Sequence, residues 1–175
     1  MHPGINGPKF KDKPAIIMAG SGEVITHQEL NELSNQGAQL FRSLGLKPGD
    51  SLAFMMENHK LFFPIAFAAY RSGLKYTAIS WRLQPSEVEY IVSDCNAKVF
   101  ITSKFLEESA KSLSESLQGV HKFMLDGSTD DFKSFETEIS KMSVSAIEDE
   151  CQGAAMLYSS GTTGKPKGVS REINL

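Results

Sequence analysis

The chain has 175 residues, of which 41% are hydrophobic and 22% charged, as expected for a globular protein with one sizeable core. Its net charge of −3 gives no basic footprint for nucleic acid, so we expect no nucleic-acid partner. The two cysteines, Cys95 and Cys151, lie far apart in the sequence. We expect them to be free thiols in a reducing, cytoplasmic compartment.

No segment predicts membrane insertion. The N-terminal stretch MHPGINGPKFKDKP has no apolar run that would serve as a secretion signal. The most apolar segment, 61–70, is far shorter than the roughly 20 residues that a membrane-spanning helix needs. We therefore expect no transmembrane segment, whereas peripheral contact with a membrane stays open.

Short apolar runs alternate with stretches of helical periodicity along the chain. Predicted strands cover 15–18, 23–26, 52–56, 75–79, 98–102, 120–125 and 154–158. Predicted helices cover 26–45, 58–71, a stretch beginning at Pro85, 103–117 and, weakly, 132–142. Thr26 and Glu29 form a capping box for the first helix, and Asn58 and Ser103 are the expected caps of the second and fourth. Gly73 is the expected stop of the second helix, and Pro85 suits a first helical position. We expect a polar loop at 143–152. Strands separated by long helices predict an α/β fold with a largely parallel sheet and crossover helices.

The stretch YSSGTTGKPKGV, residues 158–169, follows the last predicted strand and has the composition of a phosphate-binding loop. Glycines let backbone N–H groups approach an anion, hydroxyls donate further hydrogen bonds, and lysines strengthen those bonds. The candidate ligand-binding residues are Ser159, Ser160, Gly161, Thr162, Thr163, Gly164, Lys165 and Lys167.

This stretch has two other interpretations. A Walker loop, G-x-x-x-x-G-K-[ST], fails because Ser159 replaces the first glycine and Pro166 replaces the magnesium-binding hydroxyl residue. A Gly/Ser/Thr-rich hairpin without a ligand is common wherever turns are needed. It does not account for the whole twelve-residue string.

The string closely resembles the phosphate-loop signature of AMP-forming acyl-CoA synthetases, which belong to the adenylate-forming ligases. Residues 26–59, THQELNELSNQGAQLFRSLGLKPGDSLAFMMENH, are similar to the family's first helix and following strand. Residues 67–103, FAAYRSGLKYTAISWRLQPSEVEYIVSDCNAKVFITS, are similar to its next crossover units. The resemblance runs from about Lys13 to Val169.

The resemblance implies a two-step activation of a fatty or aryl carboxylic acid. The carboxylate attacks ATP to give an acyl-adenylate and pyrophosphate, and the thiol of coenzyme A then displaces AMP. The loop would grip the β- and γ-phosphates, with Lys167 a safer countercharge than Lys165, because many relatives lack lysine at position 165. Mg²⁺ is expected with ATP, and Ser159 is the hydroxyl that we expect to meet it. The oligomeric state stays open.

Family members are far longer, and their adenine, ribose and acyl sites lie mostly downstream of this loop. We therefore expect residues 1–175 to be the N-terminal part of the AMP-binding domain, truncated just after the phosphate loop and lacking the C-terminal domain. Such a fragment is expected to be inactive by itself. The alternative is a stand-alone, non-catalytic module that binds a nucleotide or phosphate. ISWRLQPSE, residues 79–87, favours acyl ligases over peptide-synthetase adenylation domains.

Several other residues are expected to have ordinary structural roles. Trp81 is expected to pack at a sheet edge, with Arg82 in solvent. His59 and His27 are expected to be surface residues without catalytic partners. The four histidines and two cysteines show no metal-ligand spacing.

Overall fold

The computed structural model describes residues 2–159 and 166–170, which form two sheets and six α-helices. The strands are β1 (Pro14–Ile17), β2 (Val24–Thr26), β3 (Ser51–Met55), β4 (Lys75–Ile79), β5 (Ala97–Ser103), β6 (His121–Leu125), β7 (Lys133–Ser134), β8 (Ala154–Ser159) and β9 (Lys167–Ser170). The helices are α1 (Pro3–Lys9), α2 (His27–Ser43), α3 (Phe62–Arg71), α4 (Pro85–Asp94), α5 (Glu107–Leu113) and α6 (Phe135–Ile139).

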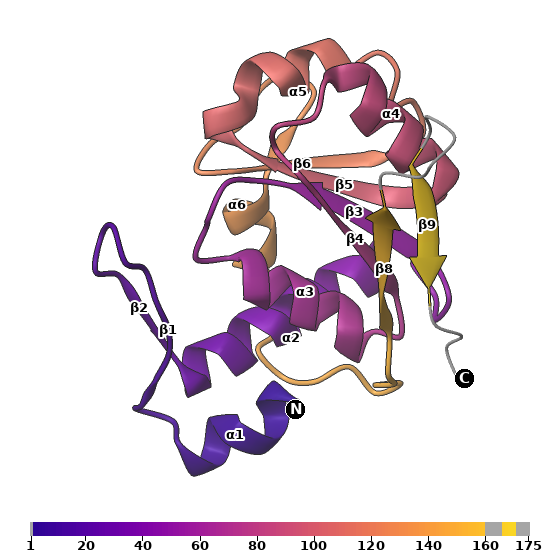
Figure 1. The fold of residues 1–175 in the computed structure, drawn as a ribbon. Helices are drawn as coiled ribbons and strands as arrows, with labels where there is room; N and C mark the ends of the chain where they lie inside the picture. The colour runs from indigo at the N-terminus through magenta and orange to yellow at the C-terminus, as the bar shows by residue number, and fades with distance from the viewer. Residues whose placement is uncertain (1, 160–165, 171–175) are drawn as a thin grey trace.

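The main sheet has the order β7-β6-β5-β3-β4-β8-β9, and every pair in it except β8–β9 is parallel. Helices cover both of its faces (Figure 1). On one face α2, α3 and α6 bury a core around Phe41, Phe54 and Ile65, and on the other α4 and α5 bury a core around Ile91 and Phe100. The predicted α/β fold with a largely parallel sheet is confirmed.

Several local predictions are confirmed by the backbone. Thr26 and Glu29 form both hydrogen bonds of the capping box at the start of α2. Gly45, just after α2, has a φ of +82°, and Gly73, just after α3, has a φ of +67°, which are left-handed conformations that glycine adopts without strain. Pro85 occupies the first position of α4.

Other predictions were wrong. Asn58 does not cap a helix, because α3 begins only at Phe62 and has no side-chain cap. Ser103 caps nothing either, since its hydroxyl donates to Glu57, and a 3-10 turn, Lys104–Leu106, precedes α5. The helix predicted to reach Leu117 ends at Leu113, and the weak helix over 132–142 is only β7 followed by α6. Helix α1 and strand β9 were not predicted.

The segment 142–150 contacts α2 although its sequence predicts only a polar loop. The amides of Asn35, Gln36 and Gln39 donate to carbonyl oxygens of residues 142–146. These bonds satisfy backbone acceptors that no ladder serves. They hold the chain against α2 just before it enters β8.

The entry into β8 is joined to the C-terminal end of α3 through the ion pair of a buried arginine. Arg71 is 2% exposed, and its Nε lies 2.5 Å from Oε1 of Glu150. Its other guanidinium nitrogens donate to Asn31 and Ser34 of α2. The backbone N–H of Gly153 donates to the carbonyl of Tyr70 at 2.6 Å. The start of β8 is thus held by the same helix that follows β3.

Candidate phosphate-binding site

The two described ends of the predicted phosphate loop lie opposite one another in a hairpin. Ser159 ends β8, Lys167 begins β9, and their Cα atoms are register partners. Because β8 runs parallel to β4, Ser159 lies at the carboxyl edge of the sheet. Open α/β sheets bind ligands at that edge. The predicted residues Ser160, Gly161, Thr162, Thr163, Gly164 and Lys165 lie outside the described residues.

Both described site residues face solvent. Lys167 is exposed and forms no ion pair with any residue that the structure describes. Its ammonium group is therefore available to a phosphate oxygen. Ser159 is likewise exposed at the end of its strand.

The inner face of the hairpin packs against α4. The hydroxyl of Tyr158 donates to Oδ2 of Asp94 at 2.5 Å, and the hydroxyl of Tyr90 donates to the carbonyl oxygen of Pro166 at 3.2 Å. Burial, and then the neighbouring Asp94 carboxylate, raise the pKa of Tyr158 well above its usual range. At neutral pH the protonated Tyr158 hydroxyl is therefore the donor in the bond to Asp94.

Polar side chains at the ends of other parallel strands lie along the same edge. His59, after β3, is 8% exposed in its side chain, and its Nε2 lies 3.0 Å from Oδ2 of Asp126, after β6. Its Nδ1 accepts the backbone N–H of Leu61 at 3.1 Å, so the proton resides on Nε2. The expectation of a surface histidine was wrong, because Asp126 is 67 residues away in sequence and only the sheet brings the two together. With both nitrogens engaged, His59 has no free lone pair for catalysis.

The segment after β4 presents an aromatic pair at this edge. Trp81 is 41% exposed and meets Phe105 edge to face, with ring centroids 6.0 Å apart. The guanidinium of Arg82 lies 5.2 Å from the centre of the Trp81 ring. Arg82 therefore contacts Trp81 through a cation–π interaction and is not simply a solvated side chain.

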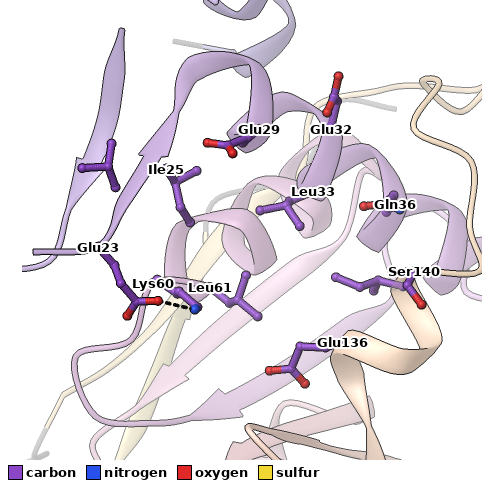
Figure 2. Close-up of a pocket in the computed structure, with 12 residues that line it drawn as sticks. Glu23, Ile25, Glu29, Glu32, Leu33, Gln36, Lys60, Leu61, Glu136 and Ser140 are labelled. Atoms are coloured by element: carbon purple, nitrogen blue, oxygen red, sulfur yellow. Dashed lines mark hydrogen bonds and ion pairs between the residues drawn. The ribbon is translucent and has the colours of Figure 1, made fainter. Parts of the chain in front are cut away.

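A separate cavity of about 530 Å³ lies between β2, α2 and α6 (Figure 2). Its apolar walls include Ile25, Leu33, Leu61 and Ile139. Its charged residues are Glu23, Glu29, Glu32, Glu136 and Lys60. Lys60 is already paired with Glu23 at 2.5 Å. Because four carboxylates outnumber one ammonium group, a polyphosphate would be repelled here, and no residue of β8 or β9 lines the cavity.

Groups of three or more His, Cys, Asp or Glu side chains able to hold a metal do not occur within residues 2–159 and 166–170. The same ranges contain no helix long and apolar enough to cross a membrane. Cys95 and Cys151 are both free, as predicted.

The fold places the chain among α/β proteins with an open, largely parallel sheet covered on both faces. The sequence pattern described as "AMP-binding enzyme" matches residues 6–173. The chain therefore belongs to the AMP-binding enzyme family, which confirms the resemblance to adenylate-forming ligases.

Three relatives illustrate the range of similar proteins. The fatty acid–[acyl-carrier-protein] ligase ScoC of Streptomyces coeruleorubidus is 27% identical over 161 residues, covering 89% of this chain and 29% of the ligase. A 4-coumarate–CoA ligase of Humulus lupulus is 28% identical over 169 residues, covering 94% and 31%. Malpibaldin synthetase of Mortierella alpina is 29% identical over 162 residues, covering 92% and 3%. This chain thus spans less than a third of the length of each.

Solved structures share the fold. The anthranilate CoA ligase AuaEII in complex with anthranoyl-AMP superposes with a TM-score of 0.85 at 24% identity, covering 96% of this chain and 33% of that one. A fatty acyl CoA synthetase of Mycobacterium tuberculosis gives a TM-score of 0.79 at 22% identity, covering 97% and 33%.

Proposed function

We propose that this chain provides the phosphate-binding part of an AMP-forming acid–thiol ligase. In this reaction the oxygen of a carboxylate attacks the α-phosphorus of ATP, and the bond from that phosphorus to the bridging oxygen breaks, releasing pyrophosphate. The thiol of coenzyme A then attacks the acyl carbon and AMP leaves. The observation that carries the proposal is the position of the signature loop. The chain belongs to the AMP-binding enzyme family, and the two described ends of its signature loop lie at the carboxyl edge of the sheet.

The loop residues have roles that follow from their chemistry. Negative charge grows on the departing pyrophosphate, so donors and cations placed there stabilise the transition state more than the ground state. We assign Lys167 as countercharge because its exposed ammonium group has no ion pair with a described residue. The hydroxyls of Ser160, Thr162 and Thr163, the glycines Gly161 and Gly164, and Lys165 would provide the remaining donors and the close backbone approach.

Magnesium fits this site only as a companion of ATP. Mg²⁺ prefers oxygen ligands and in nucleotide sites is held by few protein groups together with phosphate oxygens and water. The exposed Ser159 hydroxyl is such an oxygen ligand, and the described residues offer no carboxylate cluster to complete a site without substrate. When bound, the ion would neutralise phosphate charge, and Ser159 would orient it.

The acid is proposed as a fatty or aryl carboxylic acid, because relatives are named for fatty acids, 4-coumarate and ferulate. The oxalate–CoA ligase of Arabidopsis thaliana, 29% identical over 173 residues, shows that a similar sequence also accompanies a very different acid. Residues 79–87 favour coenzyme A ligases over peptide synthetases in this proposal.

Two measurements test the proposal. Calorimetry with ATP and with inorganic pyrophosphate should show saturable binding that Lys167→Ala weakens and that Lys133→Ala, an exposed lysine on β7, leaves unchanged. Equal binding by both variants would refute the role of Lys167. We expect ATP–pyrophosphate exchange with fatty and aryl acids to be absent for the 175-residue chain alone. Robust exchange would contradict the proposed inactivity, and release of ADP would indicate a kinase or ATPase. Saturable binding without exchange by the native protein would favour the stand-alone binding module.

A further inference from the structure

The phosphate-loop motif contains two residues, Tyr158 and Gly168, that the phosphate chemistry does not require. They are register partners across the β8–β9 hairpin. A Cβ atom added at Gly168 would lie 3.0 Å from both Cζ and Oη of Tyr158 and closer still to Cε of Met156. The Tyr158 ring therefore lies close to the Gly168 backbone, and a larger residue at position 168 would require Met156 and Tyr158 to shift.

Alternation along β8 separates two faces of the hairpin. Met156 and Tyr158 pack against the core that includes α4, whereas Leu157 is 64% exposed and Ser159 is exposed with it. The contact of Tyr158 with α4 therefore fixes the face to which Ser159 points. Beyond the first two residues of β8, which pair with β4, the described ladder partner of β8 is β9.

Asp94 occupies an unfavourable place for a carboxylate. It is the last residue of α4, where the helix dipole disfavours negative charge, and the last turn of α4 has no basic residue. The described residues form no ion pair with it. Its short described hydrogen bond comes from the hydroxyl of Tyr158 at 2.5 Å. The hydroxyl of Tyr90 lies 3.5 Å from Oδ1 of Asp94 but closer, at 3.2 Å, to the carbonyl oxygen of Pro166, which takes its single proton. Charge-assisted bonds of this kind are about twice as strong as neutral ones.

The contacts of α4 reach both strands that flank the loop. Asp94 accepts from Tyr158 on β8, and Tyr90, one helical turn earlier, donates to the carbonyl of Pro166, the residue immediately before β9. One turn of α4 thus contacts both strands next to the loop, at the end of the hairpin where Ser159 faces Lys167.

We propose that Asp94 and Tyr90 are positioning residues for the phosphate loop, holding its two flanking strands at a fixed spacing through Tyr158, Gly168 and Pro166. The inference rests on the proposed function, because the spacing matters for catalysis only if the loop binds the phosphates. Strands that are already held at a fixed spacing do not have to be ordered when a ligand binds, which lowers the cost of binding.

The test compares Asp94→Ala, Asp94→Asn, Tyr158→Phe and Gly168→Ala with two controls, Tyr70→Phe and Asp130→Ala. Asp130 is exposed in the loop before β7. Tyr70 lies in α3, and its backbone carbonyl, which Tyr70→Phe leaves unchanged, accepts the N–H of Gly153. The first readout is the dissociation constant for inorganic pyrophosphate with magnesium. The second is amide hydrogen exchange at Leu157 and Val169, which face one another in the hairpin. Far-UV circular dichroism verifies that each variant is folded.

We expect Asp94→Ala, Tyr158→Phe and Gly168→Ala to weaken pyrophosphate binding by about tenfold and to accelerate exchange in the hairpin. Asp94→Asn keeps an oxygen acceptor for Tyr158 and should recover most of the binding, which a general loss of stability would not predict. Unchanged binding in folded Asp94→Ala and Tyr158→Phe overturns the inference. If the wild-type chain does not bind pyrophosphate, the proposed function fails. Amide exchange then tests only whether α4 holds the hairpin: faster exchange in Asp94→Ala supports that contact, and unchanged exchange overturns it.

Discussion

Replacing Arg71 by methionine should destabilise the protein by about 3 kcal/mol, because it removes a buried arginine from an ion pair and from its hydrogen bonds. Methionine keeps the apolar stem of the arginine, so the loss is mostly that of the charge and its hydrogen bonds. Arg71 is 2% exposed, and it donates to Glu150, Ser34 and Asn31. The Glu150 side chain left behind is 33% exposed and regains some hydration, which limits the loss.

The expected loss is large compared with the total free energy of unfolding. Domains of this kind are stable by about 5–15 kcal/mol, so the substitution removes a substantial fraction of the free energy of unfolding. With a urea dependence of about 2 kcal/mol/M, the midpoint of unfolding should fall by roughly 1.5 M. Urea titration followed by far-UV circular dichroism measures this shift.

Two further variants identify the cause. Arg82→Met should cost less than about 1 kcal/mol, because this arginine is exposed and its guanidinium contacts the Trp81 ring. Arg71→Met combined with Glu150→Gln should be more stable than Arg71→Met alone, because no uncompensated carboxylate remains. Because Arg71 holds the segment before β8, amide exchange at Gly153 and Ala154 should accelerate in Arg71→Met. A midpoint shift no larger than that of Arg82→Met would refute the reasoning.

Three other predictions concern glycine packing, tyrosine ionisation and thiol access. Gly153→Ala would place a Cβ 2.2 Å from the carbonyl oxygen of Leu74 and should cost at least about 2 kcal/mol in urea unfolding, whereas Gly20→Ala, in open space, should cost less than about 0.5. Burial, and then the hydrogen bond to Asp94, raise the pKa of Tyr158 in the folded protein, whereas a tyrosine in the unfolded chain ionises at about pH 10. This group should therefore leave the free energy of unfolding unchanged below about pH 10 and lower it as the pH rises further. Urea titrations at alkaline pH should show a smaller decrease in that free energy with pH for Tyr158→Phe than for the wild type. An equal decrease in both proteins would contradict the prediction. Burial raises the pKa of the Cys95 thiol, which is 5% exposed, so it should react with a thiol reagent far more slowly than Cys151; equal rates would show that α4 opens readily.

Much of the fold followed from local chemistry. The capping box at Thr26, the proline at the first turn of α4 and the left-handed glycines after α2 and α3 are decided by residues within a few positions of one another. Such interactions form in any compact state that contains the helix, so sequence patterns report them. The alternation of apolar runs and helical stretches predicted the parallel sheet for the same reason.

The failed predictions are those in which a distant partner competes for a polar group. Ser103 would cap a helix in isolation, but the sheet places it beside Glu57, and its hydroxyl donates there instead. His59 reads as a surface residue until β6 brings Asp126 to it. Side-chain hydrogen bonds to a charged partner outweigh a local cap, so the tertiary contact decides.

The candidate site divides in the same way. The twelve-residue string 158–169 by itself predicted phosphate chemistry, because its glycines, hydroxyls and lysines together supply the donors and charge that a polyphosphate needs. The contacts of Tyr158 and Pro166 with α4 could not be predicted from the sequence, since their partners, Asp94 and Tyr90, lie 64 or more residues earlier. Only the packing of the hairpin on α4 showed that Tyr158 of this motif contacts the helix.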